Sequence, residues 1–68
     1  MGNIYKRVGS NIRKYRVKKG WTQEELAFNA KLHRAYIGQI ERCEKKAGLI
    51  NLEKIAKAFS IDIIELLK

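Results

Sequence analysis

The stretch QEELAFNAKLHRAYIGQIER, residues 23–42, decides the fold. Its apolar residues fall into two short groups at helical spacing, and the pattern falters between them at residues 29–31. The residues expected to face inward are Leu26, Ala27, Leu32, Ile37 and Ile40. The pattern predicts two short helices joined by a tight turn, with the second helix running from about Arg34 to Arg42.

The residue before each of these two helices is suited to begin it. Thr22 and Glu25 form a capping-box pair, in which the Thr22 side chain accepts a hydrogen bond from the Glu25 amide and Glu25 reaches back. His33 occupies the cap position before the second helix. Ala27 must be small, because the second helix crosses close to the first there. Two helices joined in this way form a helix-turn-helix, which we place over about residues 23–42.

Helical spacing of apolar residues extends to both sides of this motif. It predicts one helix from residue 4 to about Lys19, where Gly20 favours a stop, and another from Leu49 to near Ser60. Between the motif and the second of these helices, residues 43–48 show no periodicity and are expected to form a loop. The further inward-facing residues are Ile4, Val8, Ile12, Tyr15, Leu49, Leu52, Ile55, Ala56 and Phe59.

The C-terminal end carries more apolar side chains than one buried face requires. Asp62 and Glu65 repeat the capping pattern and predict a fifth, short helix. We expect a dimerisation patch over about residues 60–68, although some of its side chains complete the core. The residues of this patch are Ile61, Ile63, Ile64 and Leu67. With no proline and no strand alternation, residues 1–68 are expected to form a single all-α domain.

The charge of the chain is strongly basic. Lys and Arg outnumber Asp and Glu by 15 to 7, so the formal net charge is +8. Residues 1–20 alone hold seven bases and no acid. A well-solvated basic helix would explain a modest excess, but this asymmetry favours a surface that faces a polyanion.

The composition also excludes several classes of protein. A 46% share of hydrophobic residues supports a packed core rather than disorder. Cys43 has no partner for an internal disulfide, and no Cys/His cluster has metal-ligand spacing, so we expect neither a metal nor a cofactor. The sequence shows neither a nucleophile–base pair nor paired carboxylates, so we do not expect an enzyme. No apolar run is long enough to span a membrane, so we expect no membrane partner and a cytoplasmic location.

Three stretches carry a wider resemblance: IRKYRVKKGWTQEELA at residues 12–27, YIGQIER at 36–42 and LEKIAKAF at 52–59. In these stretches the chain resembles the Cro/C1 or Xre-type helix-turn-helix regulators, over about residues 8–67. HRAYIGQIER and the short length look most like the controller proteins of restriction-modification systems. The resemblance implies a compact five-helix, lambda-repressor-like DNA-binding domain.

The second helix of the motif would lie in the major groove of double-stranded DNA and read bases. Arg34 would grip guanine, Gln39 would pair with adenine, and Ala35 would contact a thymine methyl. The expected base-reading residues are His33, Arg34, Ala35, Tyr36, Gly38 and Gln39. Two alternative interpretations remain: Arg34 could be a solvated or phosphate-facing cation, and Tyr36 could pack on the neighbouring loop.

Contacts to DNA phosphates are expected at Gln23, Arg42, Lys45 and Lys46. The resemblance implies that Gln23 binds a phosphate through its side chain and the helix N-terminal amides, which attract phosphate by themselves. An ordinary exposed residue is the alternative for Gln23, and a solvated loop is the alternative for the three bases. The resemblance also implies a structural ion pair between Arg16 and Glu41.

Two residues depart from the family pattern. Lys31 stands in the turn where the family usually has glycine, and a left-handed backbone there would cost about 1 to 2 kcal/mol. We therefore expect the turn to differ locally. Gly38 lies inside the recognition helix, at a cost of up to about 1 kcal/mol relative to alanine. Close approach of the helix backbone to DNA would explain this glycine, and so would sequence drift.

We expect a homodimer whose occupancy is set by protein concentration, and its two-fold symmetry would make the operator palindromic, with half-sites about 34 Å apart. The resemblance implies that one such operator lies at the protein's own promoter. RNA polymerase is a further candidate partner. We expect no small-molecule effector, because little chain follows the fourth helix. The alternatives are an antitoxin-like or phage-type repressor of the same fold, and a non-specific nucleic-acid-binding protein.

Overall fold

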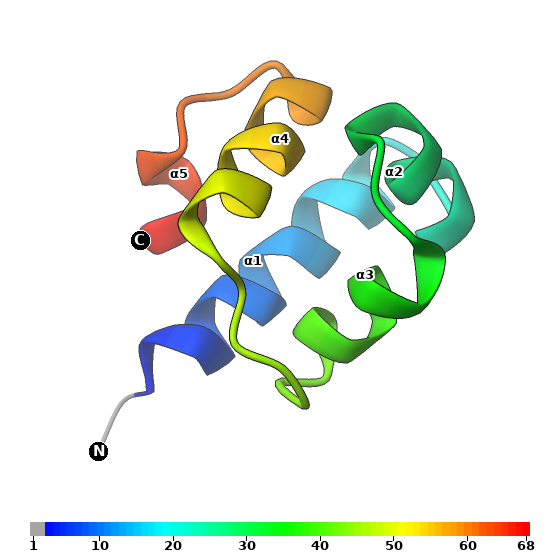
Figure 1. The fold of residues 1–68 in the computed structure, drawn as a ribbon. Helices are drawn as coiled ribbons and strands as arrows, with labels where there is room; N and C mark the ends of the chain where they lie inside the picture. The colour runs from blue at the N-terminus through cyan, green and yellow to red at the C-terminus, as the bar shows by residue number, and fades with distance from the viewer. Residues whose placement is uncertain (1–2) are drawn as a thin grey trace.

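The computed structural model describes residues 3–68, which fold into five α-helices. Figure 1 shows α1 passing through the molecule, with α2 and α3 on one side and α4 and α5 on the other. The molecule measures 32 × 23 × 21 Å along its principal axes. The helices are α1 (Ile4–Lys18), α2 (Gln23–Ala30), α3 (Arg34–Glu41), α4 (Leu49–Phe59) and α5 (Ile64–Leu67). The all-α prediction is confirmed, and α2 and α3 form the helix-turn-helix.

The predicted helix starts around the motif are confirmed in atomic detail. Thr22 Oγ1 accepts the Glu25 amide at 3.0 Å, and a Glu25 carboxylate oxygen accepts the Thr22 amide at 2.8 Å. His33 Nδ1 accepts the Ala35 amide at 3.1 Å. These bonds satisfy amides that the first turn of a helix leaves without a partner. They fix where α2 and α3 begin, and so where their exposed first turns lie.

The core is built from the expected apolar faces of four helices, with α5 closing one end. Its buried residues are Val8, Ile12, Leu26, Ala27, Ala30, Ile37, Ile40, Leu52, Ile55, Ala56, Phe59 and Leu66. The Phe59 ring lies between Trp21 and Tyr15, with ring centroids 5.8 and 5.6 Å away. This aromatic group joins α4 to the C-terminal half of α1 and to the residues that lead into α2.

Two inward predictions are wrong. Ile4 is 44% exposed and Leu49 is 72% exposed. Each is the first residue of its helix, and both line a surface groove instead of the core. Helical periodicity gives the correct face, but the first turn of a helix extends past the elements that cover the rest of it.

The start of α5 agrees only in part with the predicted capping pattern. Asp62 Oδ1 accepts the Ile64 amide at 2.9 Å, although the N-cap residue of α5 is Ile63. Glu65 does not reach back: its carboxylate accepts a bond from the Tyr15 hydroxyl at 3.3 Å and pairs with Lys68 Nζ at 2.9 Å. The bond from Lys68 lowers the pKa of Glu65. Glu65 therefore ties α5 to α1 instead of closing a capping box.

Candidate nucleic-acid interface

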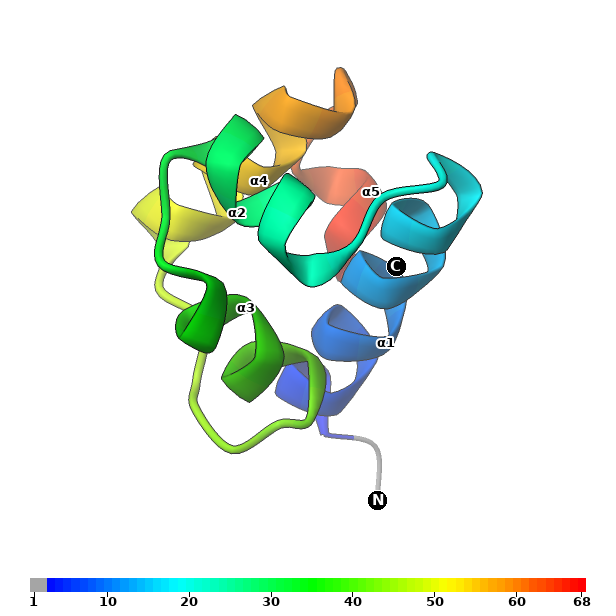
Figure 2. The same cartoon turned by 90° about the vertical axis from the view of Figure 1, so that its right-hand side faces the viewer.

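A surface groove runs between the first turn of α2 and the outward face of α3. Figure 2 shows the ribbons of these two helices side by side. Capping places the start of both helices at this groove. One wall comes from the beginning of α2 and the other from α3, with Arg16 of α1 also contributing. The lining residues are Arg16, Thr22, Gln23, Glu24, Arg34, Ala35, Gly38, Gln39 and Arg42. The groove therefore brings together most of the predicted base-reading and phosphate-binding residues.

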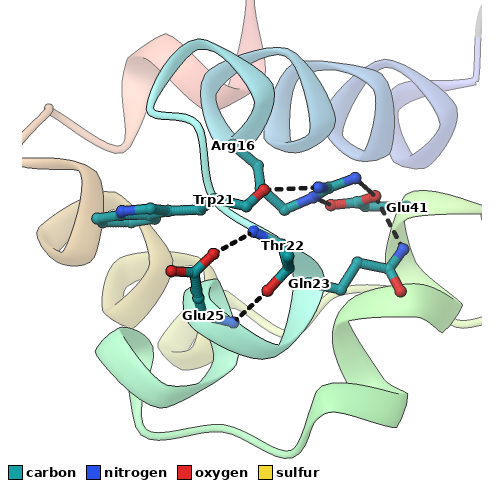
Figure 3. A network of polar contacts seen from close by, with 6 residues as sticks. All are labelled: Arg16, Trp21, Thr22, Gln23, Glu25 and Glu41. Atoms are coloured by element: carbon teal, nitrogen blue, oxygen red, sulfur yellow. Dashed lines mark hydrogen bonds and ion pairs between the residues drawn. The ribbon is translucent and has the colours of Figure 1, made fainter.

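The expected pair of Arg16 and Glu41 is present and forms part of a network (Figure 3). Arg16 Nε and Nη2 donate to the two Glu41 carboxylate oxygens at 2.7 and 3.1 Å, and Arg16 Nη1 donates to the Trp21 carbonyl at 2.8 Å. The side chains are 13% and 3% exposed, respectively. The network joins α1, the end of α3 and the entry to α2, and so fixes the angle at which α3 is presented.

Gln23 belongs to the same network. Its Nε2 donates to Glu41 Oε1 at 3.1 Å, across the groove from α2 to α3. An amide nitrogen carries two donors, so a second N–H is left for another acceptor. The residue is half-buried at the N-terminus of α2, which suits an anion. The arrangement is compatible with the predicted phosphate contact and adds a structural bond that the sequence does not indicate.

The exposed part of α3 carries the predicted base-reading side chains. Arg34 and Ala35 are exposed, and Gln39 is half-buried at the groove. Arg34 Nη1 lies 3.3 Å from Glu24 Oε2, with both side chains largely exposed. His33 is exposed and uses Nδ1 as a cap, which leaves Nε2 as its other polar atom. These four side chains are open to an approaching ligand.

Gly38 and Tyr36, two of the expected base-reading residues, lie against other parts of the chain. Gly38 is buried, and a Cβ there would lie 2.9 Å from Arg42 Nη1 and 3.3 Å from Gln23 Oε1. Both atoms are the far ends of flexible side chains, so these contacts do not by themselves require glycine. The Tyr36 hydroxyl accepts the Gly48 amide at 3.2 Å, at the start of α4. This bond agrees with the alternative that Tyr36 packs on the loop.

The bases that follow α3 lie beside acidic and aromatic neighbours. Arg42 Nε and Nη2 donate to the Glu44 carboxylate at 2.8 and 3.2 Å. These hydrogen bonds raise the pKa of Arg42 and lower that of Glu44. Lys45 and Lys46 are exposed, and Lys46 Nζ lies 5.5 Å from the centroid of the Tyr5 ring. All three bases are accessible at the C-terminal end of α3.

The turn between α2 and α3 keeps its helix-turn-helix form despite Lys31. The residue has φ 58° and ψ 45°, a left-handed conformation, and its amide donates to carbonyls of Ala27 and Phe28. The next amide, of Leu32, donates to Ala27 O at 2.9 Å. Hydrogen bonds that close the end of α2 thus impose a conformation that favours glycine. The left-handed conformation on which the expected cost depends is therefore present at Lys31.

Two residues that hold the helices together were missed by the sequence analysis. A Cβ on Gly9 would overlap the carbonyl oxygen of Ile40 and lie 3.0 Å from that of Glu41, so α1 and α3 meet backbone to backbone there. Asn11 Nδ2 donates to the carbonyls of Leu66 and Lys68, each at 3.1 Å, and fastens α5 to α1. Both partners lie far away in sequence, and no local pattern marks them.

Within residues 3–68 no group of three or more His, Cys, Asp or Glu side chains is placed to hold a metal ion. None of the helices described is long and apolar enough to cross a membrane.

Comparisons with known proteins agree with this geometry. The helix-turn-helix family profile matches residues 12–66. A hypothetical transcription factor of Neisseria meningitidis is 44% identical over 84% of this chain, which spans 54% of that protein's length. Control protein C.BamHI of Bacillus amyloliquefaciens is 42% identical, over 96% of this chain and 82% of the relative. The crystal structure of the restriction-modification controller protein C.AhdI from Aeromonas hydrophila superposes with a TM-score of 0.88, at 39% identity, over 91% of this chain and 94% of that one.

The chain belongs to the helix-turn-helix family of Cro/C1-type transcription regulators. Within that family, its close homologues include restriction-modification controller proteins.

Proposed function

We propose that this protein is a sequence-specific regulator that binds double-stranded DNA and controls restriction-modification genes together with its own promoter. The observation that carries the proposal is the groove between α2 and α3, where the exposed side chains of Arg34 and Ala35 stand beside the N-terminus of α2. Similarity to control proteins over almost the whole chain supports it. A regulator of this kind needs no catalytic centre, and we assign none.

The proposal gives α3 the reading of base edges in the major groove. Arg34 pairs with guanine, Gln39 with adenine and Ala35 with a thymine methyl, while His33 contributes Nε2. Tyr36 and Gly38 act mainly by shaping the helix surface. Phosphate contacts come from Gln23 at the N-terminus of α2 and from the exposed bases Arg42, Lys45 and Lys46.

A homodimer is the proposed binding species, assembled from a single domain formed by residues 1–68. The α5 region supplies the patch: Ile64 is 58% exposed, while Ile61, Ile63 and Leu67 are half-buried against the core. Covering Ile64 in a dimer would remove apolar surface from water. Two copies related by a two-fold axis would read a palindrome with half-sites about 34 Å apart. RNA polymerase is a proposed partner at the promoter, and occupancy would be set by protein concentration.

Selection of duplexes from a random-sequence library at about 150 mM salt tests this function, because phosphate binding alone is weakened there. We expect enrichment of a two-fold symmetric motif. A pool without enrichment would rule out operator recognition, and with it the phage-type repressor. Binding at low salt without sequence preference would then favour the non-specific alternative, and binding of a protein partner would favour the antitoxin-like one.

A further inference from the structure

Glu24 places a carboxylate at the groove through which DNA is expected to be read. It lies in the first turn of α2, and its Oε2 is 3.3 Å from Arg34 Nη1 in the first turn of α3. The two side chains are 72% and 68% exposed and line the same groove. A carboxylate here repels approaching phosphates. The position is therefore unfavourable for a protein that only has to bind a polyanion.

The contact with Glu24 leaves Arg34 free to bind a second group. The hydrogen bond to Glu24 engages Nη1, whereas a guanidinium carries five donors in a planar fork. Guanine offers O6 and N7 for a bidentate pair, but a phosphate attracts a cation in any orientation. Arg34 can thus keep one edge on Glu24 and present another edge to a base.

We propose that Glu24 is a positioning residue that determines specificity: it orients Arg34 toward guanine and disfavours the use of Arg34 on phosphates. This inference rests on the proposed DNA-reading function of α3. At a matching site, Arg34 keeps its hydrogen bond to Glu24 and forms a further pair of hydrogen bonds with guanine. At a non-matching site, Arg34 can keep its hydrogen bond to Glu24, and it then neutralises no phosphate. If it breaks that bond to bind a phosphate, the Glu24 carboxylate is left unpaired near the DNA backbone.

The pair of Arg42 and Glu44 provides a contrast at the other end of α3. The guanidinium of Arg42 binds Glu44 with both Nε and Nη2, and its proposed partner is a phosphate. Glu44 therefore opposes binding to every sequence alike. Glu44→Gln should raise affinity for all duplexes by one common factor, about twofold to threefold, in keeping with an exposed pair. Discrimination between sequences should not change.

The test compares Glu24→Gln with Glu53→Gln, which removes the same charge from an exposed position of α4 outside the groove. Each protein is titrated against the selected operator and a scrambled duplex of equal length, by fluorescence anisotropy at about 150 mM salt. We expect Glu24→Gln to bind the scrambled duplex about fivefold more tightly, within the range for an exposed pair, and the operator within about twofold of the wild type. Glu53→Gln should leave the ratio of the two affinities unchanged.

A second background separates positioning from general repulsion. In Arg34→Ala, replacing Glu24 should shift both duplexes by the same factor, because no guanidinium remains to be oriented. The inference would be overturned if replacing Glu24 reduced discrimination as much in Arg34→Ala as in the wild type. It would also be overturned if Glu24→Gln and Glu53→Gln had the same ratio of operator affinity to scrambled-duplex affinity. If wild-type protein binds operator and scrambled duplex equally, the proposed function itself fails, and the inference fails with it.

Discussion

At the scale of single residues, the left-handed conformation of Lys31 is a local strain that the rest of the turn enforces. Lys31→Gly should stabilise the fold by about 0.5 to 1 kcal/mol, since relief of the left-handed strain exceeds the extra freedom of glycine in the unfolded chain. Urea unfolding measures the change. Lys19→Gly is the matched control, because it removes the same charge at a residue with φ −77° and should not stabilise.

The ion pair between Arg16 and Glu41 is a second feature of this scale, and its two ends are not equivalent. Replacing either partner should lower the free energy of unfolding by about 3 to 5 kcal/mol, because a charge is left poorly solvated. Arg16→Met should cost more than Glu41→Gln, since the stranded Glu41 side chain is 3% exposed and Arg16 would keep its bond to the Trp21 carbonyl. Chemical denaturation of both variants checks this order. Equal and small losses would show that the pair contributes little.

At the scale of helices, the close contact of α1 with α3 depends on Gly9. Gly9→Ala should destabilise the protein by about 1 to 3 kcal/mol, because its Cβ meets backbone atoms of Ile40 and Glu41 that cannot move aside. Gly38→Ala is the matched comparison: its Cβ meets the flexible ends of side chains, and alanine is the better helix former. Thermal melts should show a clear loss for the first variant and a change within about 1 kcal/mol for the second. Similar losses in both would contradict the proposed crossing.

The same scale shows what the sequence could and could not predict. Helix positions were predictable because their causes are local: the capping box at Thr22 and the apolar spacing both lie within one turn of the residues they organise. The roles of Gly9 and Asn11 were not predictable, because each depends on a backbone carbonyl more than 30 residues away. The pairing of α2 with α3 was predictable from the motif, but the bond from Gln23 to Glu41 required the fold.

At the scale of the whole molecule, we propose that two copies associate through the exposed apolar surface of α5. Ile64→Lys should weaken dimerisation by about tenfold or more while the monomer stays folded, because the side chain is 58% exposed and its replacement buries no charge in the core. Sedimentation equilibrium measures the association, and circular dichroism reports the fold. Phe28→Lys makes the same kind of change at an 83% exposed residue of α2 and should leave association unaltered. Equal effects of the two changes would place the interface elsewhere.

The central claim is that the exposed face of α3 reads bases of a two-fold operator through Arg34, and repeating the library selection with Arg34→Ala tests it most directly. We predict that the symmetric motif is recovered with its spacing intact, that the preference for guanine disappears at one position of each half-site, and that affinity for the original operator falls by about 1 to 3 kcal/mol. Recovery of the wild-type motif with unchanged affinity would contradict the claim, because base reading would then belong to another surface.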